Sequence, residues 1–366
     1  MYVITNRAVD NSRSGLEKFL STSGAEGALD LKVVEITGAK SSPTVKILPD
    51  RVSKTEVKRL QRKFNLDIDT DAIHYQSLSL ACRLFEAARK EKKHIVLFVH
   101  GYNNDMQDVF KATRDLERLY PKTIFVPFSW PAKGGGAVSG TANYLDDKRD
   151  ARASSGALDR VIALIRHYHL LLTEGSNKEL WTKAKEKHRN NPEAARAHYV
   201  ALQERLCKVT VNLVCHSMGC YLLKHVALPT QTCIRKLVFD NVCLIAPDAN
   251  NEDHKDWLDV IETRGNTYVV INENDHALKW ARRKPGEEQK RRLGHYLKRL
   301  DSQYGTYLDV TGSKGVGDNH SYHRLARSKT STRLYRMFER LFTGEFPERY
   351  TSQMEYLADI NAYRVK

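Results

Sequence analysis

Short apolar runs alternate with segments of helical periodicity along the chain from residue 94 onward. Apolar runs of about four to eight residues are typical of strands buried on both faces, and apolar residues three and four apart are typical of helices. The expected strands cover residues 94–99, 123–130, 209–215, 237–245, 267–272 and 306–310, and the expected helices cover residues 105–119, 145–172 and 218–228. This alternation predicts the α/β class, with a mostly parallel central sheet and helices on both faces.

The segment from Val211 to Gly219 runs from one of these strands into a helix and carries a serine at the turn. Its letters Val-Cys-His-Ser-Met-Gly fit the nucleophile-elbow pattern G-x-S-x-G, except that Cys215 takes the first small position. A serine at the start of a helix faces unpaired N–H groups, and the helix dipole favours developing negative charge there. We therefore predict Ser217 as a nucleophile and the N–H of Met218 as the first oxyanion donor. The short motif alone could arise by chance, and its strand and helix context gives it weight.

The first strand of this region ends in the segment His-Gly-Tyr-Asn-Asn of residues 100–104. A His-Gly step after an early buried strand is the usual place of the second oxyanion donor, and Gly101 allows a close approach of the backbone. We expect the donor to be the N–H of Tyr102, with that of Asn103 as the alternative, and His100 to brace the loop. The other interpretation is an ordinary turn, because Asn and Gly also mark turns.

A serine hydroxyl is activated by a histidine that an acidic residue orients, and in the α/β-hydrolase fold the chain order is serine, acid, histidine. His320 follows the last predicted strand in a glycine-containing loop and is the expected base; His323 is its rival, and is otherwise a histidine on a helix surface. Asp275 and Asp248 each end a predicted strand, at the sheet edge where catalytic groups gather. We favour Asp275 as the acid, because Asp248 is also placed to cap the following helix.

With these pieces in order, the chain from about residue 94 to 323 resembles an uncharacterised family of bacterial α/β-hydrolases, esterase-like and of unassigned substrate. The resemblance rests on residues 98–104, 128–131, 147–153, 216–219, 246–248, 275–278 and 320–322. It implies the α/β-hydrolase fold and a triad of Ser217, Asp275 and His320. It also implies that Trp130 and Tyr102 line the site.

The chain departs from the family pattern at two positions. Cys215 stands where Ala or Gly is usual, and Asn319 stands where a glycine usually precedes the catalytic histidine. Neither change removes a reacting group, so we expect an active enzyme. The residues expected to line the substrate pocket are His100, Gly101, Asn103, Trp130, His216 and Asp248.

Three ranges are expected along the chain. Residues 1–90, with short strand-like runs and helical segments, should join the edge of the sheet, residues 91–345 should form the catalytic domain, and residues 346–366 should be a C-terminal tail. Residues 173–206 form a helical insertion before the nucleophile strand, polar and longer than an ordinary connection. The insertion is either a lid over the site or a solvated helical excursion. Residues 134–140, rich in glycine, should be a flexible loop.

The chain is strongly basic, with 59 Lys and Arg against 44 Asp and Glu and a net charge of +15. Such a balance favours an anionic partner, or serves solubility alone. The stretch from Lys279 to Arg299 follows Asp275 and is basic, so it either attracts an anionic substrate or membrane surface or is a solvated segment. The expected substrate is a small-molecule or lipid ester. We expect no metal, no cofactor and no nucleic acid, and the sequence does not give an oligomeric state.

The six cysteines include no C-x-x-C pair, which predicts reduced thiols and a cytoplasmic location. No run of 18 apolar residues suggests a membrane span, and the N-terminal residues lack the pattern of a secretory signal. Together these features predict a serine hydrolase that cleaves a carboxylic ester through an acyl-enzyme, carboxylesterase-like or lipase-like. The alternative is a catalytically silent protein of the same fold that binds nucleic acid or an anionic surface through its basic face. An intact triad argues against that alternative.

Overall fold

The computed structural model describes residues 1–25, 30–205, 209–228, 237–283 and 290–366. Within these residues the main sheet has eleven strands, joined edge to edge. In spatial order they are β12 (Met354–Leu357), β13 (Ala362–Val365), β11 (Gly305–Asp309), β10 (Thr267–Ile271), β9 (Val242–Ile245), β8 (Val211–His216), β6 (His94–Val99), β7 (Thr123–Ser129), β1 (Tyr2–Thr5), β4 (Lys32–Ala39) and β5 (Ser42–Ile47). Neighbouring strands from β13 to β1 are parallel, whereas β12, β4 and β5 pair antiparallel. The predicted mostly parallel sheet is confirmed.

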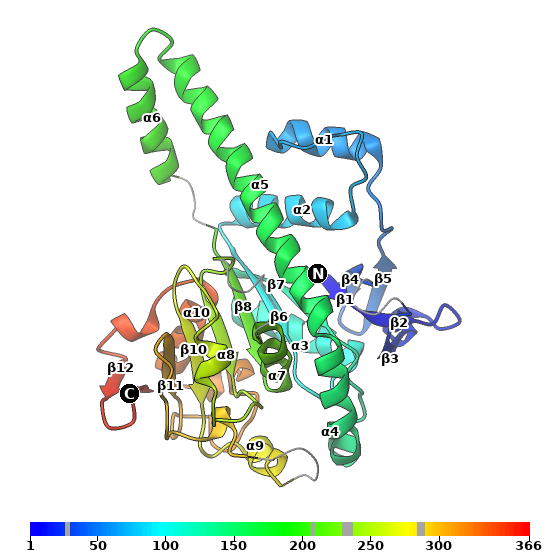
Figure 1. Cartoon of the computed structure of the whole chain (residues 1–366), viewed down its shortest axis with the longest axis vertical. Helices are drawn as coiled ribbons and strands as arrows, with labels where there is room; N and C mark the ends of the chain where they lie inside the picture. The colour runs from blue at the N-terminus through cyan, green and yellow to red at the C-terminus, as the bar shows by residue number, and fades with distance from the viewer. Residues whose placement is uncertain (26–29, 206–208, 229–236, 284–289) are drawn as a thin grey trace. The chain divides into compact units, whose positions relative to one another are not determined.

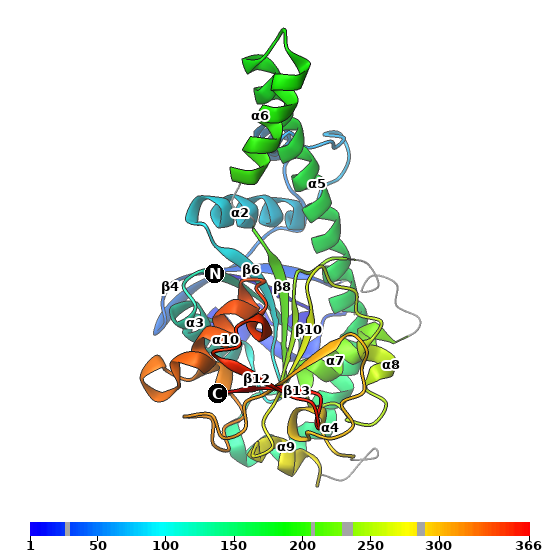
Figure 2. The same cartoon turned by 90° about the vertical axis from the view of Figure 1, so that its left-hand side faces the viewer.

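Helices cover both faces of this sheet, as predicted. Helices α3 (Met106–Leu119) and α10 (Thr332–Phe342) pack on one face, and α7 (Met218–Ala227) packs on the other (Figure 2). Helix α7 contacts both α4 (Gly136–Ala153) and the short α8 (Lys255–Leu258). The short helix α9 (His276–Ala281) follows β10. A separate two-stranded sheet pairs β2 (Arg7–Val9) with β3 (Phe19–Ser23).

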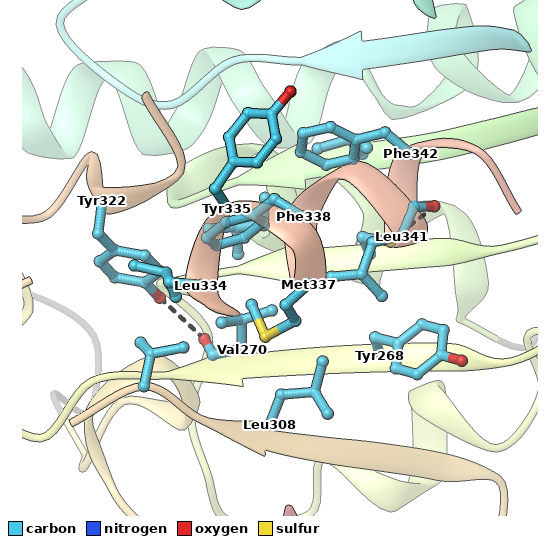
Figure 3. Close-up of a cluster of buried hydrophobic side chains, with 14 of the residues drawn as sticks. Tyr268, Val270, Leu308, Tyr322, Leu334, Tyr335, Met337, Phe338, Leu341 and Phe342 are labelled. Carbon is cyan, nitrogen blue, oxygen red and sulfur yellow. Dashed lines mark hydrogen bonds between the residues drawn. The ribbon is translucent and has the colours of Figure 1, made fainter. Parts of the chain in front are cut away.

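The core beneath α10 follows directly from helical and strand periodicity. The apolar side chains of α10 recur three and four residues apart, so they share one face. They are Leu334, Met337, Phe338, Leu341 and Phe342, each buried. Figure 3 shows them above Tyr268 and Val270 of β10 and Leu308 of β11, which alternate along their strands to the same side. This layer fixes the loops at the ends of β10 and β11.

Two expectations about helices are wrong. Residues 145–172 do not form one helix, because α4 ends at Ala153 and α5 (Ser155–Lys187) begins two residues later. The break at Ser154 is buried and held by a hydrogen bond from the side chain of Asn6 to the Ser154 hydroxyl (3.0 Å). The glycine-rich residues 134–140 are not all loop, because α4 already starts at Gly136. Glycine lowers helix propensity, but extending a helix that is already packed costs far less than starting one.

By its internal contacts the chain divides into two compact units. Met1–Ile47, His94–Ile162 and Thr210–Lys366 form the first, which contains the main sheet, and Leu48–Lys93 with Ala163–Val209 form the second. These units cut across the three ranges expected from the sequence. The expected C-terminal tail contains β12 and β13, and β13 pairs with β11.

The second unit contains α1 (Lys54–Phe64), α2 (Gln76–Glu91), most of α5 and all of α6 (Pro192–Arg205). The end of α5 and α6 run antiparallel (Figure 1), with the rings of Trp181 and Tyr199 5.3 Å apart. The insertion is therefore mostly helical as far as residue 205, and its role as a lid stays a prediction. No helix among the described residues is both long and apolar enough to cross a membrane.

Candidate active site

Ser217 lies at the sharp turn between β8 and α7, with a left-handed φ of 55°. This backbone conformation is costly for a residue with a side chain and is common at functional sites. A Cβ on Gly219 would lie 2.6 Å from the carbonyl oxygen of Val99, and one on Gly101 would lie 2.9 Å from Cβ of Ser217. The turn therefore packs directly on the end of β6, which only glycine permits at these two positions.

The loop after β9 braces the same turn. The N–H of Ser217 donates to the carbonyl of Ile245 (3.0 Å), and the N–H of Asp248 donates to the carbonyl of Ser217 (3.1 Å). Ala246 in this loop and Asn103 after β6 also have positive φ, 47° and 55°. Strained residues thus follow three adjacent strands at the carboxyl edge of the sheet, where α/β folds place their sites.

His320 and Asp275 form a hydrogen-bonded pair. Nδ1 of His320 lies 2.7 Å from Oδ2 of Asp275, which is fully buried. The other carboxylate oxygen accepts the N–H of Leu278 (3.1 Å) and so caps α9. Nε2 of His320 is buried and has no hydrogen-bond partner among the described residues. When Nδ1–H donates to the carboxylate, a neutral imidazole has its lone pair at Nε2, ready to accept a proton.

Tyr322 ties the His320 loop to the strand that ends near Asp275. Its hydroxyl donates to the carbonyl of Val270 in β10 (3.1 Å), and its ring lies 6.2 Å from that of Phe338 in α10 (Figure 3). The loop is held a second time by His216, whose Nε2 lies 3.1 Å from the carbonyl oxygen of His320. Asp275 and His320 are therefore positioned by the same packed layer.

The rival acid and the rival base have other surroundings. Asp248 is buried in an ion pair with Arg292 (Nε to Oδ1 3.0 Å) and accepts the hydroxyl of Tyr144 (3.0 Å). His323 is fully buried, with its ring 6.3 Å from that of Phe98 and no hydrogen bond to either ring nitrogen among the described residues. The structure pairs His320 with Asp275 and brings neither rival into that contact.

The loop after β6 is built around His100 and Trp130, both buried. Their rings stack at 5.0 Å and 3°, and the indole N–H of Trp130 donates to the carbonyl of His100 (2.9 Å). Nδ1 of His100 lies 2.7 Å from the carbonyl oxygen of Gly101. Burial lowers the pKa of His100 to about 3, so this ring is neutral.

The alternative oxyanion donor in this loop is bonded to a carboxylate. The N–H of Asn103 donates to Oδ2 of Asp147 at 2.7 Å. Tyr102 is partly buried, with its ring edge-on to Tyr144 at 5.5 Å. Met218 is the first residue of α7, where backbone N–H groups have no partner within the helix. The N–H groups of Met218 and Tyr102 stay the predicted donors.

Four of the six cysteines lie within the residues that the structure describes. Cys82, Cys215, Cys220 and Cys243 are free and buried, and Cys207 and Cys233 lie outside the described residues. Burial raises the pKa of the Cys215 thiol well above its ordinary value. No three His, Cys, Asp or Glu side chains of the described part lie together as metal ligands would.

The basic stretch is not uniformly a surface. Residues 284–289, Lys284 among them, lie outside the described residues. Trp280 is 51% exposed, with the guanidinium of Arg283 5.4 Å from its ring centre. Arg292, by contrast, is buried and its charge is matched by Asp248. At least one charge of the basic stretch therefore forms a buried ion pair and does not lie on the surface.

The chain matches a known protein family. The family described as "Alpha/beta hydrolase of unknown function (DUF900)" matches residues 79–174 and 176–317, more than half of the chain. The chain belongs to this family. The resemblance expected from the sequence is confirmed, and the matched ranges include Ser217 and Asp275 and end just before His320.

Two further comparisons add little. No curated protein matches the chain. A solved structure titled "Crystal structure of esterase PE8" is similar over 68% of this chain and 92% of its own, with 15% identity and a TM-score of 0.32. The α/β-hydrolase assignment therefore rests on the family match and on the sheet described above.

Sequence reasoning missed several residues that hold this region together. No prediction from the sequence covered Arg7 or Tyr144. Asp147 was named only as part of the range 147–153, and Arg292 only as one charge of the basic stretch. Arg7 had one usable signal: it follows the first strand almost directly. An arginine just past the end of a strand that joins a parallel sheet lies at the edge where sites form.

Acid is expected to destabilise the fold through His323. Burial lowers the pKa of His323 well below 6.5, so the unfolded chain binds a proton that the folded protein does not. Below about pH 6.5 this histidine makes the unfolding free energy fall by about 1.4 kcal/mol per pH unit as pH falls. Replacing His323 by Leu should remove that slope between pH 6 and 5, measured by urea unfolding. His323→Gln should remove the same slope, and an unchanged slope in both variants would contradict the prediction.

Proposed function

We propose that the protein is a serine esterase with Ser217 as nucleophile, His320 as base and Asp275 as the acid that orients the base. The observation that carries the proposal is the 2.7 Å contact of His320 Nδ1 with Asp275, while Nε2 of His320 has no hydrogen bond among the described residues. It is supported by the left-handed φ of Ser217, which a nucleophile elbow requires. The three residues follow the order serine, acid, histidine that the fold uses.

In the proposed reaction the Ser217 hydroxyl gives its proton to Nε2 of His320 as Oγ bonds to the ester carbonyl carbon. Asp275 stabilises the imidazolium that forms. The N–H groups of Met218 and Tyr102 bind the oxyanion of the tetrahedral intermediate. When the intermediate collapses, the ester C–O bond breaks and His320 protonates the leaving alkoxide. Water then attacks the acyl-enzyme, His320 takes its proton, and the acid leaves as Ser217 regains its hydrogen.

We expect a carboxylic ester of a small molecule or a lipid, rather than a thioester or an amide. The exposed part of the basic stretch, with Trp280 beside it, supports an anionic substrate or surface as an additional contact. Free buried thiols support a cytoplasmic location. A panel of p-nitrophenyl esters of increasing acyl length would measure the preferred chain length.

The test of the proposal is covalent labelling by a fluorophosphonate probe. The folded wild-type protein should be labelled, the adduct should lie on the peptide containing Ser217, and Ser217→Ala should take no label. Ser42→Ala, on an exposed edge strand, is the matched control and should label as the wild type does. If folded wild-type protein stays unlabelled while a reference esterase reacts, the proposal fails and the silent binding protein becomes the better reading.

A further inference from the structure

Two loops meet at the carboxyl edge of the sheet, residues 100–104 after β6 and residues 130–135 after β7. The fully buried side chain of Arg7 bonds to both. Its guanidinium donates to the carbonyl of Asn104 (2.8 Å) and to the carbonyl of Ala132 (2.9 Å). It also donates to the hydroxyl of Ser129 (2.9 Å), at the end of β7.

Asp147 of α4 bonds to the same two loops with the opposite charge. Its Oδ2 accepts the N–H of Asn103 (2.7 Å), and its Oδ1 accepts the N–H of Lys133 (2.9 Å). The peptide group between Ala132 and Lys133 is thus held at both ends, its carbonyl by Arg7 and its N–H by Asp147. In the other loop the two side chains hold adjacent residues, Asn103 and Asn104.

Local structure explains how residue 7 reaches this edge. Strand β1 runs parallel to β7, with Thr5 opposite Ser129, so the chain leaves β1 at the carboxyl edge. The hydroxyl of Thr5 donates to the carbonyl of Ser129 (2.6 Å) and fixes this exit. Arg7 follows two residues later, beside the loop that carries Tyr102.

Burying the charges of Arg7 and Asp147 costs free energy, so hydrogen bonds must compensate for it. Removing a guanidinium and a carboxylate from water costs several kcal/mol for each ion unless hydrogen bonds replace the lost hydration. Most of these bonds go to backbone groups of the two loops, which hold no strand pairing of their own. Arg7 also donates to the Ser129 hydroxyl (2.9 Å) and to the carbonyl of Leu20 in β3 (3.2 Å). Asn103 also has a left-handed φ of 55°, which must be held in place. The arrangement fixes the position of a loop more than it adds stability.

We propose that Arg7 and Asp147 are positioning residues that fix the loop of residues 100–104 so that the Tyr102 N–H points at the oxyanion beside Ser217. This inference rests on the function proposed above. An oxyanion donor acts mainly in the transition state, so a displaced loop lowers kcat and leaves KM nearly unchanged. A shift of about 1 Å is enough to slow a reaction on the order of 10²-fold.

The test uses Asp147→Asn, which keeps the shape of the side chain and removes its charge and one acceptor. Burial raises the pKa of Asp147 to about 6, so assays at pH 8 compare an ionised wild-type carboxylate with the amide. With a p-nitrophenyl ester, kcat should fall about 10- to 100-fold, somewhat less than the loss of a whole oxyanion donor. KM should stay within about threefold, because ground-state binding is not affected.

Asp240→Asn is the matched control. Asp240 also accepts a backbone N–H, that of Val211 (2.8 Å), and pairs with Arg264 (3.0 Å). Asp240 precedes β9 and bonds to the start of β8, whereas Ser217 follows the end of β8. Asp240→Asn should lower the unfolding free energy and leave kcat unchanged.

Each outcome separates the two proposals. A wild type that neither hydrolyses esters nor labels at Ser217 overturns the proposed function and this inference with it. An active wild type with wild-type kcat in folded Asp147→Asn overturns the inference alone. Should Asp147→Asn not fold, Arg7→Lys is measured instead, since it keeps the charge and loses the planar fork that bonds both loops. Wild-type kcat in folded Arg7→Lys overturns the inference, and a fall in kcat at constant KM supports it.

Discussion

Replacing Asp275 by Asn is expected to lower kcat by about 10⁴-fold, the loss that the same change causes in a serine protease triad. An amide in place of the carboxylate favours the wrong tautomer of His320, with the proton on Nε2, where it cannot accept the proton of Ser217. The Asn side-chain oxygen can still accept the N–H of Leu278, which caps α9, so the fold should remain. Steady-state ester hydrolysis and urea unfolding measure the two effects separately.

Asp248→Asn is the matched control and should do the reverse. Asp248 and Arg292 are both buried, so the substitution removes the carboxylate charge that pairs with a buried guanidinium. Removing one partner of a buried ion pair costs about 3–5 kcal/mol of stability. The contact of this residue with Ser217 uses the backbone N–H and persists, so folded Asp248→Asn should keep kcat/KM within about tenfold of wild type. A collapse of activity in Asp248→Asn with an active Asp275→Asn would make Asp248 the acid.

The strands of the sheet centre could be predicted because burial on both faces leaves a continuous apolar run. The predicted range 94–99 coincides with β6, and β8 and β10 differ from their predicted ranges by a residue or two. Strand β9 starts five residues later than expected, at Val242. The preceding Leu237 is apolar and yet 56% exposed, so hydrophobicity alone overextended the strand. Pairing with neighbours, which the sequence does not display, sets where a strand begins.

The residues of the site also fall into a group that the sequence predicts and a group that it does not. Ser217, Asp275 and His320 could be proposed because each stands in a local pattern and their order in the chain is constrained by the fold. Arg7 could not, because its bonds go to Asn104 and Ala132, which lie 97 and 125 residues further along the chain. The role of Asp147 likewise depends on which loops lie beside α4 in the folded chain. Residues that react are marked by local motifs, whereas residues that hold them in place are defined only by tertiary contacts.

Gly219→Ala is expected to damage both the fold and the reaction. The added Cβ would lie 2.6 Å from the carbonyl oxygen of Val99 and 2.7 Å from that of His100. Both atoms are backbone at the end of β6, so no flexible side chain can move aside. We expect a loss of about 2–3 kcal/mol, the upper part of the range for overpacked sites. The rate of labelling by a fluorophosphonate should fall on the order of 10²-fold, because the turn that carries Ser217 must move away from β6.

Gly15→Ala separates this steric effect from backbone strain. Gly15 has a left-handed φ of 57°, but a Cβ there would meet no atom within 4 Å. Alanine should therefore cost about 1 kcal/mol for the left-handed conformation and leave the labelling rate unchanged. Wild-type labelling in Gly219→Ala would mean that the turn can shift without moving Ser217 relative to the loop after β6. The expected loss would mean that a glycine is needed two residues after Ser217, because the turn at Ser217 and the end of β6 pack backbone against backbone.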